Sequence, residues 1–137
     1  MTMRRIPYVL EVLHFSRAPA HYREVLDHYE KRLAAGARFE SREISAIPDR
    51  ENMYILDAEG QALEDGGLEG LIRREGAAGR KLTFVVGPAE GFGQDVKGSH
   101  RRLSLAPMTM QHDLARLVLL EQIYRAVLAI SGTDYSK

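Results

Sequence analysis

The stretch GPAEGFGQDVKGSHRRLSLAPMTMQHDLARLVLLEQIYRA, residues 87–126, decides the fold of this 137-residue chain. It places a glycine-rich turn, a proline-containing loop and an almost wholly apolar helix, expected over 113–130, in immediate succession. The few polar positions of that helix, spread around its wheel, are Arg116, Glu121, Gln122 and Arg125. A helix that is apolar nearly all round is covered on more than one side. The pattern therefore predicts that the helix packs on its own sheet and on a second subunit, with loops of the same chain as the alternative cover.

The segments before this stretch alternate between strands and helices. Runs of β-branched and aromatic residues predict strands at YVLEVLHF (8–15), FESREISAI (39–47), MYILD (53–57) and KLTFVVG (81–87). Apolar residues at helical spacing predict helices over 20–36 and 67–79. Strands that alternate with helices in this way predict an α/β fold, a parallel sheet with helices on both faces. No repeat or linker divides the chain, so we expect a single domain over 1–137.

Composition excludes several kinds of function. The chain has no cysteine, which rules out disulfides, a cysteine nucleophile and a zinc site with thiolate ligands. Nineteen basic and 19 acidic residues give zero net charge, so bulk charge does not indicate a nucleic-acid partner, although a fold could gather basic doublets on one face. Glu11 interrupts the first apolar run, and no stretch approaches the roughly 20 apolar residues of a membrane span. We therefore expect a cytoplasmic protein without a membrane partner.

Three loops follow predicted strands, where open parallel sheets bind their ligands. They contain ILDAEG (55–60), VVGPAEGFG (85–93) and LSLAPMTM (103–110), and their small residues permit close main-chain contact with a ligand. Ordinary turn chemistry is the alternative for each loop taken singly. The GPAEG turn matches neither the P-loop nor the GxGxxG fingerprint. The spacing of the histidines predicts no metal site.

The sequence closely resembles the RlmH family over almost its whole length. The resemblance is carried by FVVGPAEGFGQDV (84–96), LSLAPMTMQHDLARLVLLEQIYRA (103–126) and the terminal GTDYSK (132–137). HYREVLDHYEKRL (21–33) and MYILDAEGQAL (53–63) are also similar to the family's corresponding segments. The members of this family are SPOUT-class enzymes that methylate a pseudouridine of large-subunit (23S) ribosomal RNA at a ring nitrogen, with S-adenosylmethionine as methyl donor.

The resemblance implies a SPOUT α/β-knot, in which the C-terminal segment is threaded into a trefoil knot. It implies a homodimer through the C-terminal helix, with ribosomal RNA or the assembled ribosome as partner. The implied cofactor contacts are Leu56, Gly87, Gly91, Leu105, Ala106, Pro107, Met108, Thr109 and Met110. The implied candidates for proton removal or for a polarising cation are His112, Arg116, Tyr135 and Lys137. For His112 the alternative is a helix cap, and for Arg116 it is a buried pair with a carboxylate.

The sequence departs from the family pattern in three places. Pro88 follows Gly87 where the family usually has a second glycine, and Ser136 stands where it usually has histidine. Only PDREN (48–52) separates SREISAI from MYILD, where the family commonly has a charged helix. Two alternatives therefore stay open: a SPOUT methyltransferase with a different RNA substrate, and a noncatalytic dimeric module that binds a nucleotide-like ligand.

Overall fold

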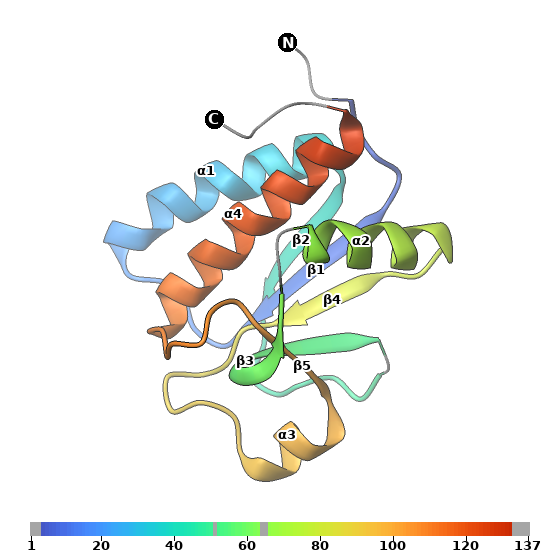
Figure 1. Cartoon of the computed structure of the whole chain (residues 1–137). Helices are drawn as coiled ribbons and strands as arrows, with labels where there is room; N and C mark the ends of the chain where they lie inside the picture. Colours follow the sequence, from blue (N-terminus) through green and yellow to red (C-terminus); the bar gives the residue numbers. More distant parts are fainter. Residues whose placement is uncertain (1–3, 51, 64–65, 133–137) are drawn as a thin grey trace.

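The computed structural model describes residues 4–50, 52–63 and 66–132, which form a five-stranded sheet and four helices (Figure 1). The elements in chain order are β1 (Val9–His14), α1 (Ala20–Gly36), β2 (Arg38–Glu43), β3 (Met53–Ala62), α2 (Gly67–Ala77), β4 (Leu82–Val85), α3 (Gln94–Ser99), β5 (Arg101–Ser104) and α4 (His112–Ser131). The predicted alternation of strands and helices is confirmed, and α3 is an element that the sequence reasoning missed.

All neighbouring strands are parallel, in the order β2-β1-β4-β3-β5. β3 is longer than predicted, because it pairs with β5 on both sides of a register shift between Leu56 and Gln61. Gly60 lies in this irregular stretch, where an added Cβ would come within 2.7 Å of the backbone of Arg102. Parallel pairing brings the carboxyl ends of β3, β4 and β5 to one edge of the sheet, which is where α/β proteins place their ligands.

The three long helices share one face of the sheet. Leu10 and Val12 of β1 and Phe84 of β4 point into the larger core, together with buried leucine and isoleucine side chains of α1, α2 and α4. Figure 1 shows α1 and α4 side by side above the strands, with α2 next to them. Side chains alternate between the two faces of a strand, so the residues between these core positions face the other way.

The opposite face carries a smaller apolar cluster. Its buried members are Leu13, Met53, Ile55 and Val85. Its partly buried cover comes from the segment 44–47 and from the region around the six-residue α3. Among the described residues no long helix lies on this face, because the 44–52 connection between β2 and β3 is too short to form one. In the described part of the chain the second face is therefore covered by loops and the short α3, so the prediction of helices on both faces holds here only through α3.

α4 is covered largely by its own chain. It packs against α1 and α2 as well as the sheet, and about one side of it stays accessible, including Leu114, which is 40% exposed. The side chain of Gln111 caps its N-terminus by accepting the backbone N–H groups of Asp113 and Leu114 at 3.0 and 3.1 Å. Gly132, with φ of 87°, ends it. Within the described ranges, no helix has the length and apolar character needed to span a bilayer.

Candidate functional site

A cleft of about 260 Å³ lies at the carboxyl ends of β4 and β5 and beside the middle of β3, near the register shift. The residues predicted as cofactor contacts that line it are Leu56, Gly87, Gly91, Leu105, Ala106, Met108, Thr109 and Met110. They come from three segments far apart in the sequence. Pro107 stands in the same loop as Met108 but is not among the lining residues. The structure thus brings together all three segments that the sequence singled out, although the first, 55–60, lies inside β3 and the prediction of a loop there is wrong.

The β3 side of the cleft carries a carboxylate that sequence reasoning missed. Asp57 accepts a hydrogen bond from Arg102 Nη1 at 3.1 Å and from the backbone N–H of Glu59 at 3.1 Å, and Lys97 Nζ lies 3.7 Å away. Burial raises the pKa of Asp57, but these donors and charges outweigh burial and hold the pKa below its usual range. Asp57 is therefore ionised at neutral pH. Its position at the end of the MYILD strand was the available signal.

The β4 side is formed by the turn after Val86. Gly91 has φ of 80°, which glycine adopts readily, and its N–H donates to the carbonyl of Pro88 at 2.9 Å. A Cβ at Gly87 would lie 2.9 Å from the ring of Phe92, so glycine at this position lets the ring fold back over the turn. Pro88 also lines the cleft, and because proline has no backbone N–H it offers no hydrogen-bond donor there.

The β5 side is the loop that leads into α4. The hydroxyl of Ser104 donates to the carbonyl of Ala106 at 2.8 Å and so fixes the start of this loop. Met108 is 69% exposed at the rim. His112, the first residue of α4, lines the cleft, and its Nε2 lies 3.4 Å from Asp113 Oδ2. The cap of α4 is Gln111, so the helix-cap alternative for His112 is wrong.

Arg116 lies away from the cleft. Its Nη2 donates to Glu30 Oε2 at 2.9 Å and to Ser41 Oγ at 3.4 Å, and its side chain is only 9% exposed. The guanidinium thus joins α4 to α1 and β2. This is the buried pair with a carboxylate that the sequence analysis gave as the alternative for Arg116. Burial and the charge of Arg116 lower the pKa of the nearby His14. The candidates Tyr135 and Lys137 lie outside the described residues.

The arrangement as a whole suits a small ligand with an apolar body and charged groups. Backbone and apolar side chains form most of the walls, and Asp57, Glu59, Lys97 and His112 supply the ionisable groups. A parallel sheet with such a cleft at its carboxyl edge defines an α/β protein that binds a small molecule through its strand-end loops.

The comparisons with known proteins narrow this class. The family model for predicted SPOUT methyltransferases matches residues 38–136. The ribosomal RNA large subunit methyltransferase H of Prochlorococcus marinus (strain MIT 9515) is 36% identical over 118 residues, covering 84% of this chain and 85% of that protein. The protein of the same name from Parasynechococcus marenigrum (strain WH8102) is 36% identical over 94 residues, covering 68% of this chain and 64% of that protein. The chain belongs to the SPOUT methyltransferase family.

A solved structure agrees at the level of the fold. It is the putative methyltransferase Lpg2936 from Legionella pneumophila, described as in complex with the bound cofactor SAM, and it matches with a TM-score of 0.53 at 12% identity. The match covers 90% of this chain and 68% of that one. The predicted parallel α/β fold and the predicted family, with its methyltransferase class, are confirmed, and S-adenosylmethionine as the cofactor of this chain stays a prediction. The knot, the homodimer and the roles of individual site residues stay predictions.

Proposed function

We propose that this protein is a methyltransferase that transfers the methyl group of S-adenosylmethionine to a ring nitrogen of a pseudouridine in 23S ribosomal RNA. In this proposal the chain acts as one domain over 1–137, in the cytoplasm. The observation that carries the proposal is the convergence of Leu56, Gly87 and the 105–110 loop on one cleft. The names of the relatives supply the substrate class.

The residues that line the cleft suit the parts of S-adenosylmethionine. Its apolar walls, including Leu56 and Leu105, suit the flat adenine ring. The ionised carboxylate of Asp57 suits either the ribose hydroxyls or a positive charge of the cofactor. The glycine-rich turn at 87–91 allows the chain to approach the ligand closely. The residues present therefore fit this cofactor.

The bound cofactor supplies a methyl group that is already activated by its sulfonium. The protein has to align the acceptor nitrogen with the methyl carbon and to accept the proton that the nitrogen loses. In that transfer a carbon–nitrogen bond would form as the carbon–sulfur bond breaks, and the neutral thioether would be the leaving group. His112 is the acid–base candidate that lines the cleft among the described residues, so we assign proton removal to its imidazole, with Tyr135 and Lys137 as tail candidates. Arg116 is the candidate that the geometry supports least, because Glu30 already pairs with it.

An apolar patch next to the cleft supports a homodimer through α4. Met108 and Leu114 are the large exposed apolar side chains, and the half-buried Leu117 and Val118 continue the patch along the helix. A contiguous patch of this kind at one end of a helix marks an interaction site. A second copy of α4 is the partner that the family predicts.

A second candidate is a SPOUT methyltransferase with a different RNA substrate. The short 44–52 connection favours it, because this chain lacks the helix that the family commonly carries there and therefore the surface that the helix would present.

The test has two stages. Isothermal calorimetry with S-adenosylmethionine should show binding to the purified protein, and failure to bind would remove both enzyme candidates. Mass spectrometry of ribosomal RNA from a deletion strain should then show loss of the methyl group from one pseudouridine of 23S rRNA. If that nucleotide is unchanged while another RNA loses a methyl group, the second candidate replaces the first.

A further inference from the structure

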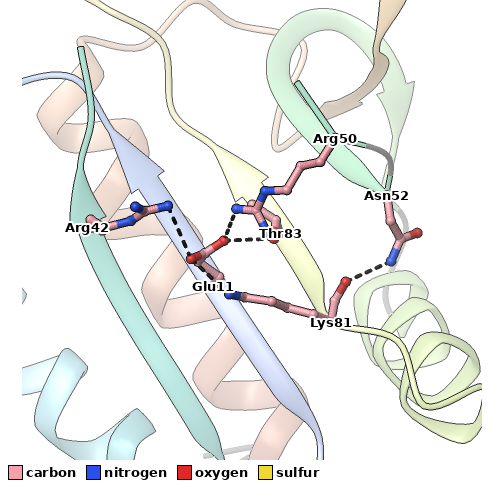
Figure 2. A network of polar contacts seen from close by, with 6 residues as sticks. All are labelled: Glu11, Arg42, Arg50, Asn52, Lys81 and Thr83. Atoms are coloured by element: carbon pink, nitrogen blue, oxygen red, sulfur yellow. Dashed lines mark hydrogen bonds and ion pairs between the residues drawn. The ribbon is translucent and has the colours of Figure 1, made fainter. Parts of the chain in front are cut away.

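A carboxylate is buried at the centre of the sheet face opposite the long helices. Glu11 points to the face opposite the long helices, and its side chain is 1% exposed. Figure 2 shows it surrounded by side chains from β2, from the 44–52 connection and from the start of β4. Arg50 and Thr83 donate hydrogen bonds to its Oε1, and Lys81 Nζ and Arg42 Nη2 lie 3.1 and 3.8 Å from its Oε2. We call these five residues the Glu11 network.

The Glu11 network carries more positive charge than the carboxylate needs. Three cations surround one anion, which leaves two positive charges uncompensated within the network. The cations are also accessible: the side chains of Arg42, Lys81 and Arg50 are 52%, 38% and 33% exposed. With Arg38 and Glu40 on the same face of β2 and Asp49 beside Arg50, four cations stand against three anions, so the region keeps a surplus of one positive charge. The surplus charge is thus held in place by a buried anion and faces solvent.

A second cavity adjoins the Glu11 network. It has a volume of about 440 Å³, and Phe15 and Phe92 line it with ring centroids 6.4 Å apart at 74°. Asp49 and His100 add polar groups to its wall. The segment before β3 belongs to both features, because Ile47, Pro48 and Asp49 line the cavity and Arg50 belongs to the network.

The second cavity lies next to the proposed cofactor cleft, on the other side of a shared wall. Pro88, Gly91 and Phe92 line both, so the turn after β4 forms the shared wall. A molecule seated in this cavity would therefore lie next to the site of methyl transfer.

We infer that the face of the sheet opposite the long helices is a docking surface for single-stranded RNA, with an unpaired base in the Phe15–Phe92 cavity and phosphates at Arg42 and Lys81. This inference rests on the proposed function for the identity of the polymer. Aromatic side chains that stack bases, set beside cations that hold the backbone, are the recurring elements of single-strand recognition. Asp49 accepts hydrogen bonds from the N–H groups of the seated base. The surface takes the place of the charged helix that this chain lacks between β2 and β3.

The test of the phosphate contacts uses the double variant Arg42→Gln/Lys81→Gln. Arg50 and Thr83 still satisfy Glu11 in this variant, so the carboxylate keeps its partners. Fluorescence anisotropy with a labelled single-stranded RNA should show affinity reduced roughly five- to eightfold per cation at about 0.1 M salt, and a shallower salt dependence. The matched control is Arg73→Gln on α2, since Arg73 is 50% exposed and is also paired with a glutamate.

The base contact is tested with Phe15, which lines the second cavity but not the cofactor cleft. Phe15→Leu keeps the apolar volume and removes the ring, and should weaken RNA binding by roughly 5- to 100-fold. Phe15→Tyr keeps the ring and should bind RNA as the native chain does. If the RNA affinity of Phe15→Leu is unchanged, or Phe15→Tyr loses as much as Phe15→Leu, the base contact is wrong.

Calorimetry with S-adenosylmethionine separates this inference from the proposed function. All of these variants should bind the cofactor normally. If the native chain binds no RNA, or if Arg73→Gln weakens RNA binding as much as the double variant, the docking surface is wrong even when cofactor binding is intact. If the native chain does not bind S-adenosylmethionine, the proposed function is contradicted, whereas the RNA-binding result is unaffected.

Discussion

Replacing Glu11 with glutamine should destabilise the protein in a way that depends on pH. Glutamine has nearly the same shape, so the substitution removes one negative charge while the apolar packing stays in place. The three cations of the Glu11 network then lose the anion that holds them together (Figure 2). Removing one partner of a fully buried ion pair costs about 3–5 kcal/mol. Here the cations are a third to a half exposed, so solvent screening reduces the expected loss to about 2 kcal/mol.

The pH dependence of the stability loss distinguishes the removal of a charge from a loss of packing. Burial raises the pKa of Glu11, but the hydrogen bonds from Arg50, Lys81 and Thr83 outweigh burial and leave the pKa below 4.5. A depressed pKa in the folded state means that the unfolded chain binds the proton more tightly. The contribution of Glu11 is therefore complete above about pH 4.5 and declines as the pH falls from there through the folded pKa.

Urea denaturation of the native chain and Glu11→Gln, from pH 7 to about pH 3.5, measures this contribution. The difference in free energy of unfolding should be about 2 kcal/mol at pH 7 and should shrink below pH 4.5, because the native carboxyl then becomes neutral as well. Arg42→Gln, which removes the most distant and most exposed cation, should cost under about 1 kcal/mol. A difference that stays constant down to the lowest pH would show that the charge of Glu11 is not what stabilises the fold.

Three further variants test the cleft, the buried pair and the dimer. Gly87→Ala should force the Phe92 ring out of its place and weaken the binding free energy of S-adenosylmethionine, measured by calorimetry, by about 1–2 kcal/mol. Native affinity in this variant would show that the turn does not touch the cofactor. Arg116→Met should lower the free energy of unfolding by about 2 kcal/mol, because Glu30 loses its partner, and should leave cofactor affinity unchanged; a stable variant that has lost only methylation would restore the catalytic role. Leu114→Asp should convert a dimer into a monomer in light scattering after size exclusion, and an unchanged mass would place the interface elsewhere.

The fold was predictable because its signals are local. The run KLTFVVG became the fully buried β4, and the spacing of Leu26 and Leu33 became the buried side of α1. The ends of α1 and α4 fell within a residue or two of the prediction, since Gly36 and Gly132 stand where each helix ends. The extension of β3 to Ala62 was not predictable, because it depends on pairing with β5 beyond a register shift.

The site was predictable to the extent that backbone determines it. The rule that ligands bind beyond the carboxyl ends of parallel strands, together with the resemblance, was enough to bring Leu56, Gly87 and Met110 to one cleft. Side-chain partners were not predictable, because they depend on which elements meet in space. Arg116 turned to Glu30 on α1, and Asp57 acquired Arg102 from a neighbouring strand, although neither pair is close in sequence.

The short connection between β2 and β3 explains why an acidic residue can stand in the middle of a parallel strand. In a sheet covered by helices on both faces, a carboxylate at position 11 would meet apolar side chains and be too costly to ionise. Here loops cover that face and the 44–52 connection itself contributes Arg50, so Arg42, Arg50 and Lys81 reach Glu11 while their side chains stay a third to a half exposed. Glu11 thus interrupts the apolar run of β1 on the face where β2, the 44–52 connection and the start of β4 supply cations. The surplus charge of this face is where, in our inference, an RNA strand would bind.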